Sequence, residues 1–158
     1  MPSNLLILPK IGVGTWQLNS KTCAKTVLNA LDIGYRLIDT AQFYRNEDGV
    51  GEAIDATYLS REEFLVATKV WITNLSPARL LKSVDQSLRK LHTPYLDLLY
   101  LHWPAAWFYK PAATWHALDS LVDAGKVRYL AVSNFSIALV EEALRFAKHP
   151  IVEKLLTL

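Results

Sequence analysis

Cysteine is nearly absent from this sequence of 158 residues, in which Cys23 is the only one. A lone cysteine cannot form a disulfide within the chain, so we expect a reducing compartment. Long apolar runs are missing too: none approaches the roughly 20 residues that cross a membrane, and the amino-terminal segment lacks the basic stretch of a signal peptide. The formal net charge is only +2, and the charged residues are scattered along the chain. These absences predict a cytoplasmic protein that binds neither membrane nor nucleic acid.

Several sequence motifs of enzyme chemistry are also missing. The dinucleotide-binding fingerprint G-x-G-x-x-G begins at Gly12-Val13-Gly14, but Gln17 stands where the third glycine belongs. No G-x-S-x-G motif of a serine hydrolase occurs. One cysteine and four well-separated histidines do not make a zinc site, so no metal is expected.

Short β-rich segments alternate with segments of helical spacing. The β-rich segments are Ile11–Trp16, Arg36–Asp39, Phe64–Lys69, Asp97–His102 and Val127–Ser133. The helical segments are Thr22–Ile33, Asn46–Tyr58, one that begins at Ser76-Pro77, Ala112–Ala124 and Ser136–Ala147. This α/β alternation predicts parallel strands in a single domain over residues 1–158. Five such units fit either a flavodoxin-like doubly wound sheet or a partial (β/α)8 TIM barrel.

Polar residues stand at the carboxyl ends of the predicted strands. Asp39 ends the second strand, Lys69 the third and His102 the fourth, and Ser133-Asn134 ends the fifth. Each has an ordinary structural explanation when taken alone; a histidine that closes an apolar run is more often a core residue with satisfied ring nitrogens. The carboxyl ends of parallel strands meet at one rim of the fold, where ligands bind. Four successive polar ends therefore favour a functional site.

The residues at this rim suit carbonyl reduction. Lys69 and Asp39 would form a buried ion pair, which needs further hydrogen bonds to be tolerated. Tyr44 follows Asp39 on the loop, and a neighbouring ammonium group favours its phenolate, whereas burial acts in the opposite direction. A phenol that donates a proton to an oxygen, beside an imidazole such as that of His102, fits a carbonyl substrate.

Four segments in order resemble the aldo-keto reductase family. They are GYRLIDTAQFYRNEDGVG (34–51), FLVATKVW (64–71), LDLLYLHWP (96–104) and AVSNF (131–135). Ala131 departs from the glycine that is usual in the family. Ordered motifs at matching spacing are far more specific than a single match.

The resemblance implies an NADP(H)-dependent enzyme that acts on a small-molecule carbonyl substrate. The implied catalytic residues are Asp39, Tyr44, Lys69 and His102, with Tyr44 as the proton donor and Lys69 lowering its pKa. The implied cofactor-binding residues are Thr15, Asp39, Ser133 and Asn134. Trp16, Trp71 and Trp103 resemble the walls of an apolar substrate pocket, although large aromatic residues also populate protein cores.

The resemblance covers only part of the family's eight-stranded barrel, which typically needs about 250 residues. The segment 151–158 begins like a sixth strand and then becomes more helical in character. We therefore expect a truncated barrel of five βα units whose first and fifth strands, Ile11–Trp16 and Val127–Val132, are open edges. Open edges promote pairing with another chain, so self-association is expected.

Three functions remain open from the sequence. The first is NADP(H)-dependent reduction of an aldehyde or ketone to an alcohol. The second is a catalytically inactive barrel fragment that acts as an interaction or scaffold module. A flavodoxin-like binding domain is the third.

Overall fold

The computed structural model describes residues 7–104 and 107–155. Its sheet has six parallel strands: β1 (Val13–Gly14), β2 (Leu37–Asp39), β3 (Leu65–Val70), β4 (Leu96–Leu101), β5 (Val127–Ser133) and β6 (Ile151–Leu155). The helices are α1 (Ser20–Asp32), α2 (Glu47–Ala56), α3 (Pro77–Lys90), α4 (Pro111–Asp123) and α5 (Ile137–Phe146). Three short 3-10 helices accompany them: η1 (Gln42–Tyr44), η2 (Arg61–Glu63) and η3 (Ile72–Asn74). None of the described helices is long and apolar enough to cross a membrane.

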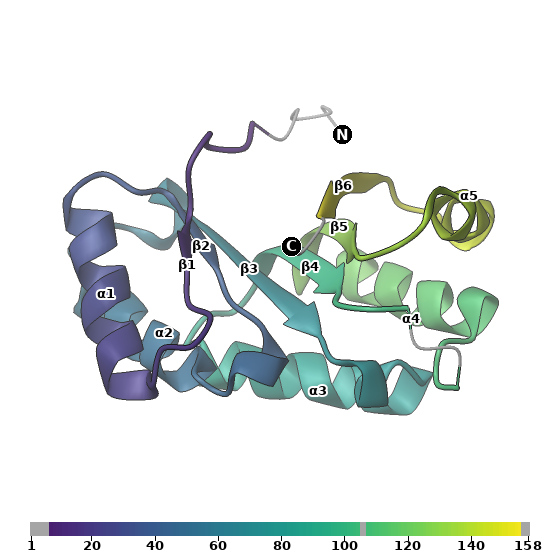
Figure 1. Cartoon of the computed structure of the whole chain (residues 1–158), viewed down its shortest axis with the longest axis horizontal. Coiled ribbons are helices and arrows are strands. Elements are labelled where there is room, and N and C mark those ends of the chain that lie inside the picture. Colours follow the sequence, from purple (N-terminus) through teal and green to yellow (C-terminus); the bar gives the residue numbers. More distant parts are fainter. Residues whose placement is uncertain (1–6, 105–106, 156–158) are drawn as a thin grey trace.

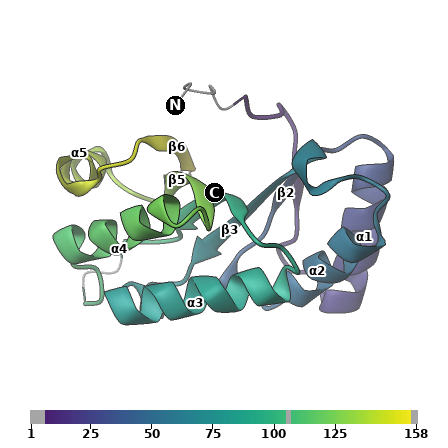
Figure 2. The same cartoon turned by 180° about the vertical axis from the view of Figure 1, so that it is seen from behind.

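The strand order decides between the two predicted architectures. Each strand pairs with the next one along the chain, so the order is β1-β2-β3-β4-β5-β6. A flavodoxin-like sheet would instead have its first strand inside the sheet. The helices form an arc around one side of the sheet, from α1 through α3 to α5 (Figure 1), and Figure 2 shows this arc from behind. The chain therefore folds as a partial (β/α)8 barrel, and the doubly wound alternative is wrong.

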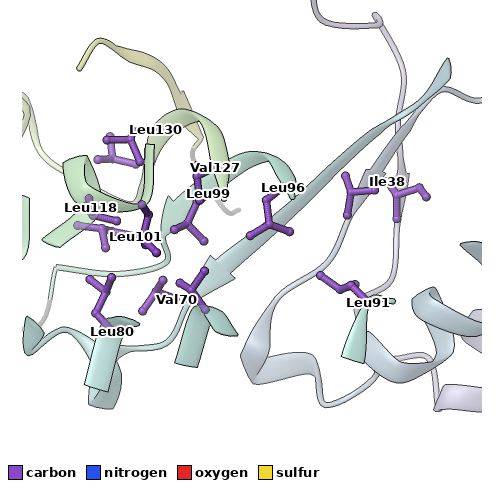
Figure 3. Packing of buried hydrophobic residues seen from close by; sticks show 14 of the residues in the cluster. Ile38, Val70, Leu80, Leu91, Leu96, Leu99, Leu101, Leu118, Val127 and Leu130 are labelled. Carbon is purple, nitrogen blue, oxygen red and sulfur yellow. The ribbon is translucent and has the colours of Figure 1, made fainter. Parts of the chain in front are cut away.

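The main core lies between the sheet and the arc of helices. Leu80 of α3 and Leu118 of α4 pack there beside strand residues such as Leu99 and Leu101 (Figure 3). The inner face carries a smaller buried cluster of Ala67, Leu98, Tyr100 and Ala131. Because both faces are covered, β4 is buried at every position, which explains its nearly continuous apolar run.

The segment after Pro150 corrects the sequence-based prediction. Residues Ile151–Leu155 form β6, which pairs with β5 through Ile151↔Leu130 and Leu155↔Ser133, and a bulge lies between these pairs. The backbone of β5 would otherwise present an unpaired edge, and this pairing satisfies it. The fifth strand is thus an interior strand, and β6 is the edge. Residues 156–158 of the predicted helical stretch lie outside the described residues.

The open edges predict self-association of a polypeptide with residues 1–158. Strands β1 and β6 end the sheet, and apolar side chains just before β1 and on β6 are exposed, namely Ile11 at 67% and Val152 at 36%. We expect dimers or larger species in light scattering over a concentration series, because edge strands pair with further strands. The substitution Ile11→Lys, at the start of the β1 edge, should reduce this association. Tyr58→Lys, on a residue that is 77% exposed just beyond α2, is the control, and a dispersed monomer with a cooperative melt would contradict the prediction.

Candidate active site

The predicted polar residues meet at one rim of the sheet. Asp39 ends β2, Lys69 lies near the end of β3, and His102 directly follows β4. Tyr44 comes from η1, which follows β2 within a few residues. Parallel pairing aligns these strand ends, so the four side chains reach the same region although up to 63 positions separate them.

Lys69 is the most deeply buried of these groups, with 1% of its surface exposed. Its ammonium donates to Asp39 Oδ1 at 2.5 Å and to the Thr40 carbonyl oxygen at 3.0 Å. Burial lowers the pKa of Lys69, because the charged form loses its hydration, while the charge and hydrogen bond of Asp39 favour the ammonium. The predicted ion pair is therefore present, together with a further hydrogen bond that satisfies the ammonium.

Tyr44 is held at the end of η1 by a tight turn. The next residue, Arg45, has a left-handed backbone with φ of 57° and donates its N–H to the Gln42 carbonyl oxygen. The Lys69 ammonium lies 5.2 Å from the centroid of the Tyr44 ring. Burial, and then the charge of Asp39, raise the pKa of Tyr44 to about 12. The lowering of this pKa by Lys69 that the resemblance implied is therefore not found, since both causes that act on the phenol raise its pKa.

His102 lies against the same tyrosine and has no ring hydrogen bond among the described residues. Its ring contacts Tyr44 edge-on, with centroids 5.8 Å apart and planes at 82°. Nδ1 is buried without a hydrogen-bond partner in the described part of the chain. Burial, and then the charge of Lys69, lower the pKa of His102 to about 4. The imidazole is therefore neutral at physiological pH.

Aromatic rings form one side of the site. Phe43 stacks on Trp71 with centroids 4.1 Å apart and on Trp16 at 5.7 Å. Trp71 also meets the His102 ring edge-on at 5.3 Å. The structure thus joins two of the three predicted tryptophans to the site. Trp103 is 44% exposed, and none of the aromatic contacts found among residues 7–104 and 107–155 involves it.

The predicted cofactor residues differ in their accessibility. Ser133 is buried at the end of β5, and Asn134 follows it with a left-handed backbone, φ 60°. Asn134 Nδ2 donates to the His102 carbonyl oxygen and to Ser133 Oγ, both at 3.0 Å. Thr15 is fully buried, and its hydroxyl donates to Thr40 Oγ1 at 2.8 Å. The hydrogen bond that the Thr15 hydroxyl donates is thus made to another residue of the chain, and contact between Thr15 and a cofactor stays a prediction.

Two polar residues that the sequence analysis missed fix the loop around Tyr44. Gln42 Oε1 accepts from the backbone N–H of Trp71 and from Asn74 Nδ2, both at 3.0 Å. Asn46 Nδ2 donates to the carbonyl oxygens of Thr15 at 2.8 Å and Leu18 at 2.9 Å. The one available signal was their position within the segment 34–51 that also contains Tyr44.

No group of three or more histidine, cysteine, aspartate or glutamate side chains that could hold a metal ion occurs in the described residues.

Parallel strands in chain order, with these four groups at their carboxyl ends, define the class of the protein as a barrel with a polar rim site. The profile of the Aldo/keto reductase family matches residues 10–154, and the chain belongs to this family. The resemblance drawn from the four sequence segments is thereby confirmed.

Individual relatives agree with this assignment. The chain is 35% identical to the NADPH-dependent D-xylose reductase of Meyerozyma guilliermondii, over 89% of this chain and 53% of that protein. It is 39% identical to the methylglyoxal reductase DkgB of Salmonella typhi, over 88% of this chain and 52% of that protein. A solved aldo/keto reductase from Brucella melitensis superimposes with a TM-score of 0.89 at 36% identity, over 96% of this chain and 58% of that one. The chain thus spans about half the length of the curated relatives that it matches.

The lowered pKa of His102 predicts a pH dependence of stability. The pKa is about 4 in the folded chain, against an ordinary 6.5. As the pH falls below 6.5, the unfolded chain binds a proton that the folded chain does not bind. The free energy of unfolding should therefore fall by on the order of 3 kcal/mol between pH 7 and pH 4 because of this residue.

Urea unfolding of the wild type and of His102→Gln at both pH values measures this contribution. The variant should lose less stability on acidification than the wild type. His116→Gln, at an exposed position on α4, is the matched control. Equal losses in the wild type and in His102→Gln would refute the assignment.

Proposed function

We propose that this chain carries the proton-donating site of an NADP(H)-dependent oxidoreductase that reduces an aldehyde or ketone to an alcohol. The observation that carries the proposal is the buried ammonium of Lys69, paired with Asp39 at 2.5 Å and lying 5.2 Å from the Tyr44 ring. Family membership and the reductase names of the relatives support the same reaction class. We further propose that residues 1–158 act as one barrel domain.

Tyr44 is proposed to hold the proton that the carbonyl oxygen receives. Its pKa of about 12 keeps the phenol protonated over the physiological range, so the proton is present when a substrate arrives. The neutral His102 can donate a hydrogen bond from Nε2 to the same oxygen and orient it. The Lys69 ammonium lies 5.2 Å from the centroid of the Tyr44 ring, and we propose that its charge stabilises negative charge that develops on the phenol.

The donor set at the end of β5 fits a nicotinamide carboxamide. The hydroxyl of Ser133 and the side-chain amide of Asn134 can both donate and accept hydrogen bonds, as a carboxamide requires. They adjoin His102, to whose carbonyl oxygen Asn134 donates. When bound, the reduced cofactor would supply the hydride, and these residues, with Thr15 and Asp39 as further candidates, would hold and orient it.

The aromatic side of the site suggests how a substrate is held. Trp16, Phe43 and Trp71 form a continuous apolar wall beside the polar rim. Such a wall excludes water from the carbonyl group and strengthens the hydrogen bonds made to it. Relatives named for D-xylose, methylglyoxal and glyoxal support a small carbonyl compound as the substrate class.

A second candidate is a non-catalytic interaction or scaffold module. The observation that favours it is that the sheet of the described residues ends in two edge strands, β1 and β6, which could pair with strands of another chain. In this case the rim residues would persist as structural groups. Binding of NADPH distinguishes the two candidates, because a scaffold role does not require it.

We expect NADPH to change the tryptophan fluorescence of the chain in a saturable way. Trp16 and Trp71 line the site, so a bound nicotinamide would alter their emission. Trp71→Phe should reduce the amplitude of this change, whereas Trp107→Phe, at a residue that is 91% exposed, should leave it unchanged. The absence of any saturable change up to millimolar NADPH would overturn the enzymatic proposal for this chain.

Replacement of Tyr44 by phenylalanine should abolish carbonyl reduction and leave NADPH affinity nearly unchanged. The ring and its packing remain, while the proton donor is lost, and general acid catalysis is typically worth about 10² to 10⁴ in rate. Tyr58→Phe is the control, since that residue is 77% exposed just beyond α2. A loss of kcat smaller than tenfold in Tyr44→Phe would mean that another group donates the proton.

A further inference from the structure

A row of four residues crosses the sheet beneath the candidate site. Lys69 on β3 is the register partner of Tyr100 on β4, and Tyr100 is the partner of Ala131 on β5. Ala131 in turn is the partner of Glu153 on β6. Paired residues of neighbouring strands lie on the same face of a sheet, so these side chains form one layer on the inner face of the barrel.

The two polar ends of this layer are connected through Tyr100. The hydroxyl of Tyr100 donates to Glu153 Oε2, although a whole strand separates β4 from β6. Two strand spacings amount to about 10 Å, which only long side chains can bridge. The methyl group of Ala131 leaves room for the tyrosine to pass above β5. A larger residue on β5 would stand in the path of this contact.

Lys69 lies between two tyrosine rings. Its ammonium is 5.8 Å from the centroid of Tyr100 and 5.2 Å from that of Tyr44, within the range of cation–π attraction. We propose that Tyr100 and Glu153 are positioning residues that support the Lys69 ammonium from the barrel interior, in addition to Asp39 at the rim.

The charged groups around Lys69 agree with this role. Asp39 from β2 and Glu153 from β6 both favour the ammonium, against a burial that disfavours it. The remaining facing groups are Tyr44 from η1, Tyr100 from β4 and His102 directly after β4, and His102 is neutral at physiological pH. Burial and the charge of Glu153 raise the pKa of Tyr100, so its hydroxyl stays a donor to that carboxylate.

The position of Glu153 explains why the tyrosine matters. Glu153, Tyr100 and Asp39 border an open hollow of about 270 Å³ on the inner face of the sheet. A carboxylate beside such a hollow is free to turn towards water unless a donor holds it. The Tyr100 hydroxyl is that donor, and it holds the carboxylate of Glu153 on the same layer as Lys69.

The role rests on the proposed function, but its test does not depend on turnover. Titration of the Lys69 side chain is followed by NMR of its ε-methylene and ammonium groups in the full chain, with Lys69→Met identifying the signal. In Glu153→Gln, which keeps size and removes charge, the Lys69 midpoint should move to lower pH. Tyr100→Phe should move it in the same direction, because the carboxylate loses its donor while the ring remains.

The control is Glu141→Gln, the same change of charge at an exposed position on α5. It should leave the Lys69 midpoint where it is. The proposal would be overturned if the Lys69 midpoint stayed unchanged in Glu153→Gln, or if Glu141→Gln moved it equally. An unchanged midpoint in Tyr100→Phe would overturn the role proposed for Tyr100. If Glu153→Gln does not fold, Tyr100→Phe decides alone. The enzymatic proposal is tested separately, by the NADPH titration and by the activity of Tyr44→Phe, so its failure can be distinguished from failure of this one.

Discussion

The ion pair between Lys69 and Asp39 is the interaction on which the rest of the rim depends. An ammonium with 1% of its surface exposed is stable only if its charge is compensated and its hydrogen bonds are made. Asp39 Oδ1 and the Thr40 carbonyl oxygen meet these needs from β2 and the residue after it. The pair therefore fixes the ends of β2 and β3 against each other. Tyr44, which follows on the same loop, is placed beside the ammonium as a consequence.

Backbone strain gathers around the same rim. Four non-glycine residues of the described chain have a left-handed backbone, and three of them directly follow a predicted site residue. These three are Gln17 after Trp16, Arg45 after Tyr44 and Asn134 after Ser133. Each such conformation is costly for an L-residue unless the surrounding structure determines it. The hydrogen bonds of Asn134 to His102 and Ser133 illustrate how the surroundings do so at one of these positions.

Sequence patterns predicted those parts of the structure that depend on local chemistry or on burial. The apolar run of β4 and the helical spacing of Ser136–Ala147, which forms α5, are readable because each follows from the residues of one segment. The start of β6 was predicted but not its extent, because the conformation of the whole strand depends on pairing with the edge of β5. Gln42 was missed because its partner Trp71 is 29 positions away. The pKa of Tyr44 could not be read from spacing, since it depends on how deeply packing buries the ring.

The arrangement of strands separates two parts of the site. Asp39 belongs to β2 and Lys69 to β3, and His102 directly follows β4; each of these strands has a paired neighbour on both sides. Their relative positions are therefore set by interior pairings and do not depend on the open edges. Ser133 lies on β5, whose outer neighbour is the edge strand β6. The strands that carry the proposed catalytic groups thus have paired neighbours on both sides in the described chain, whereas the groups proposed to hold the cofactor stand next to its open side.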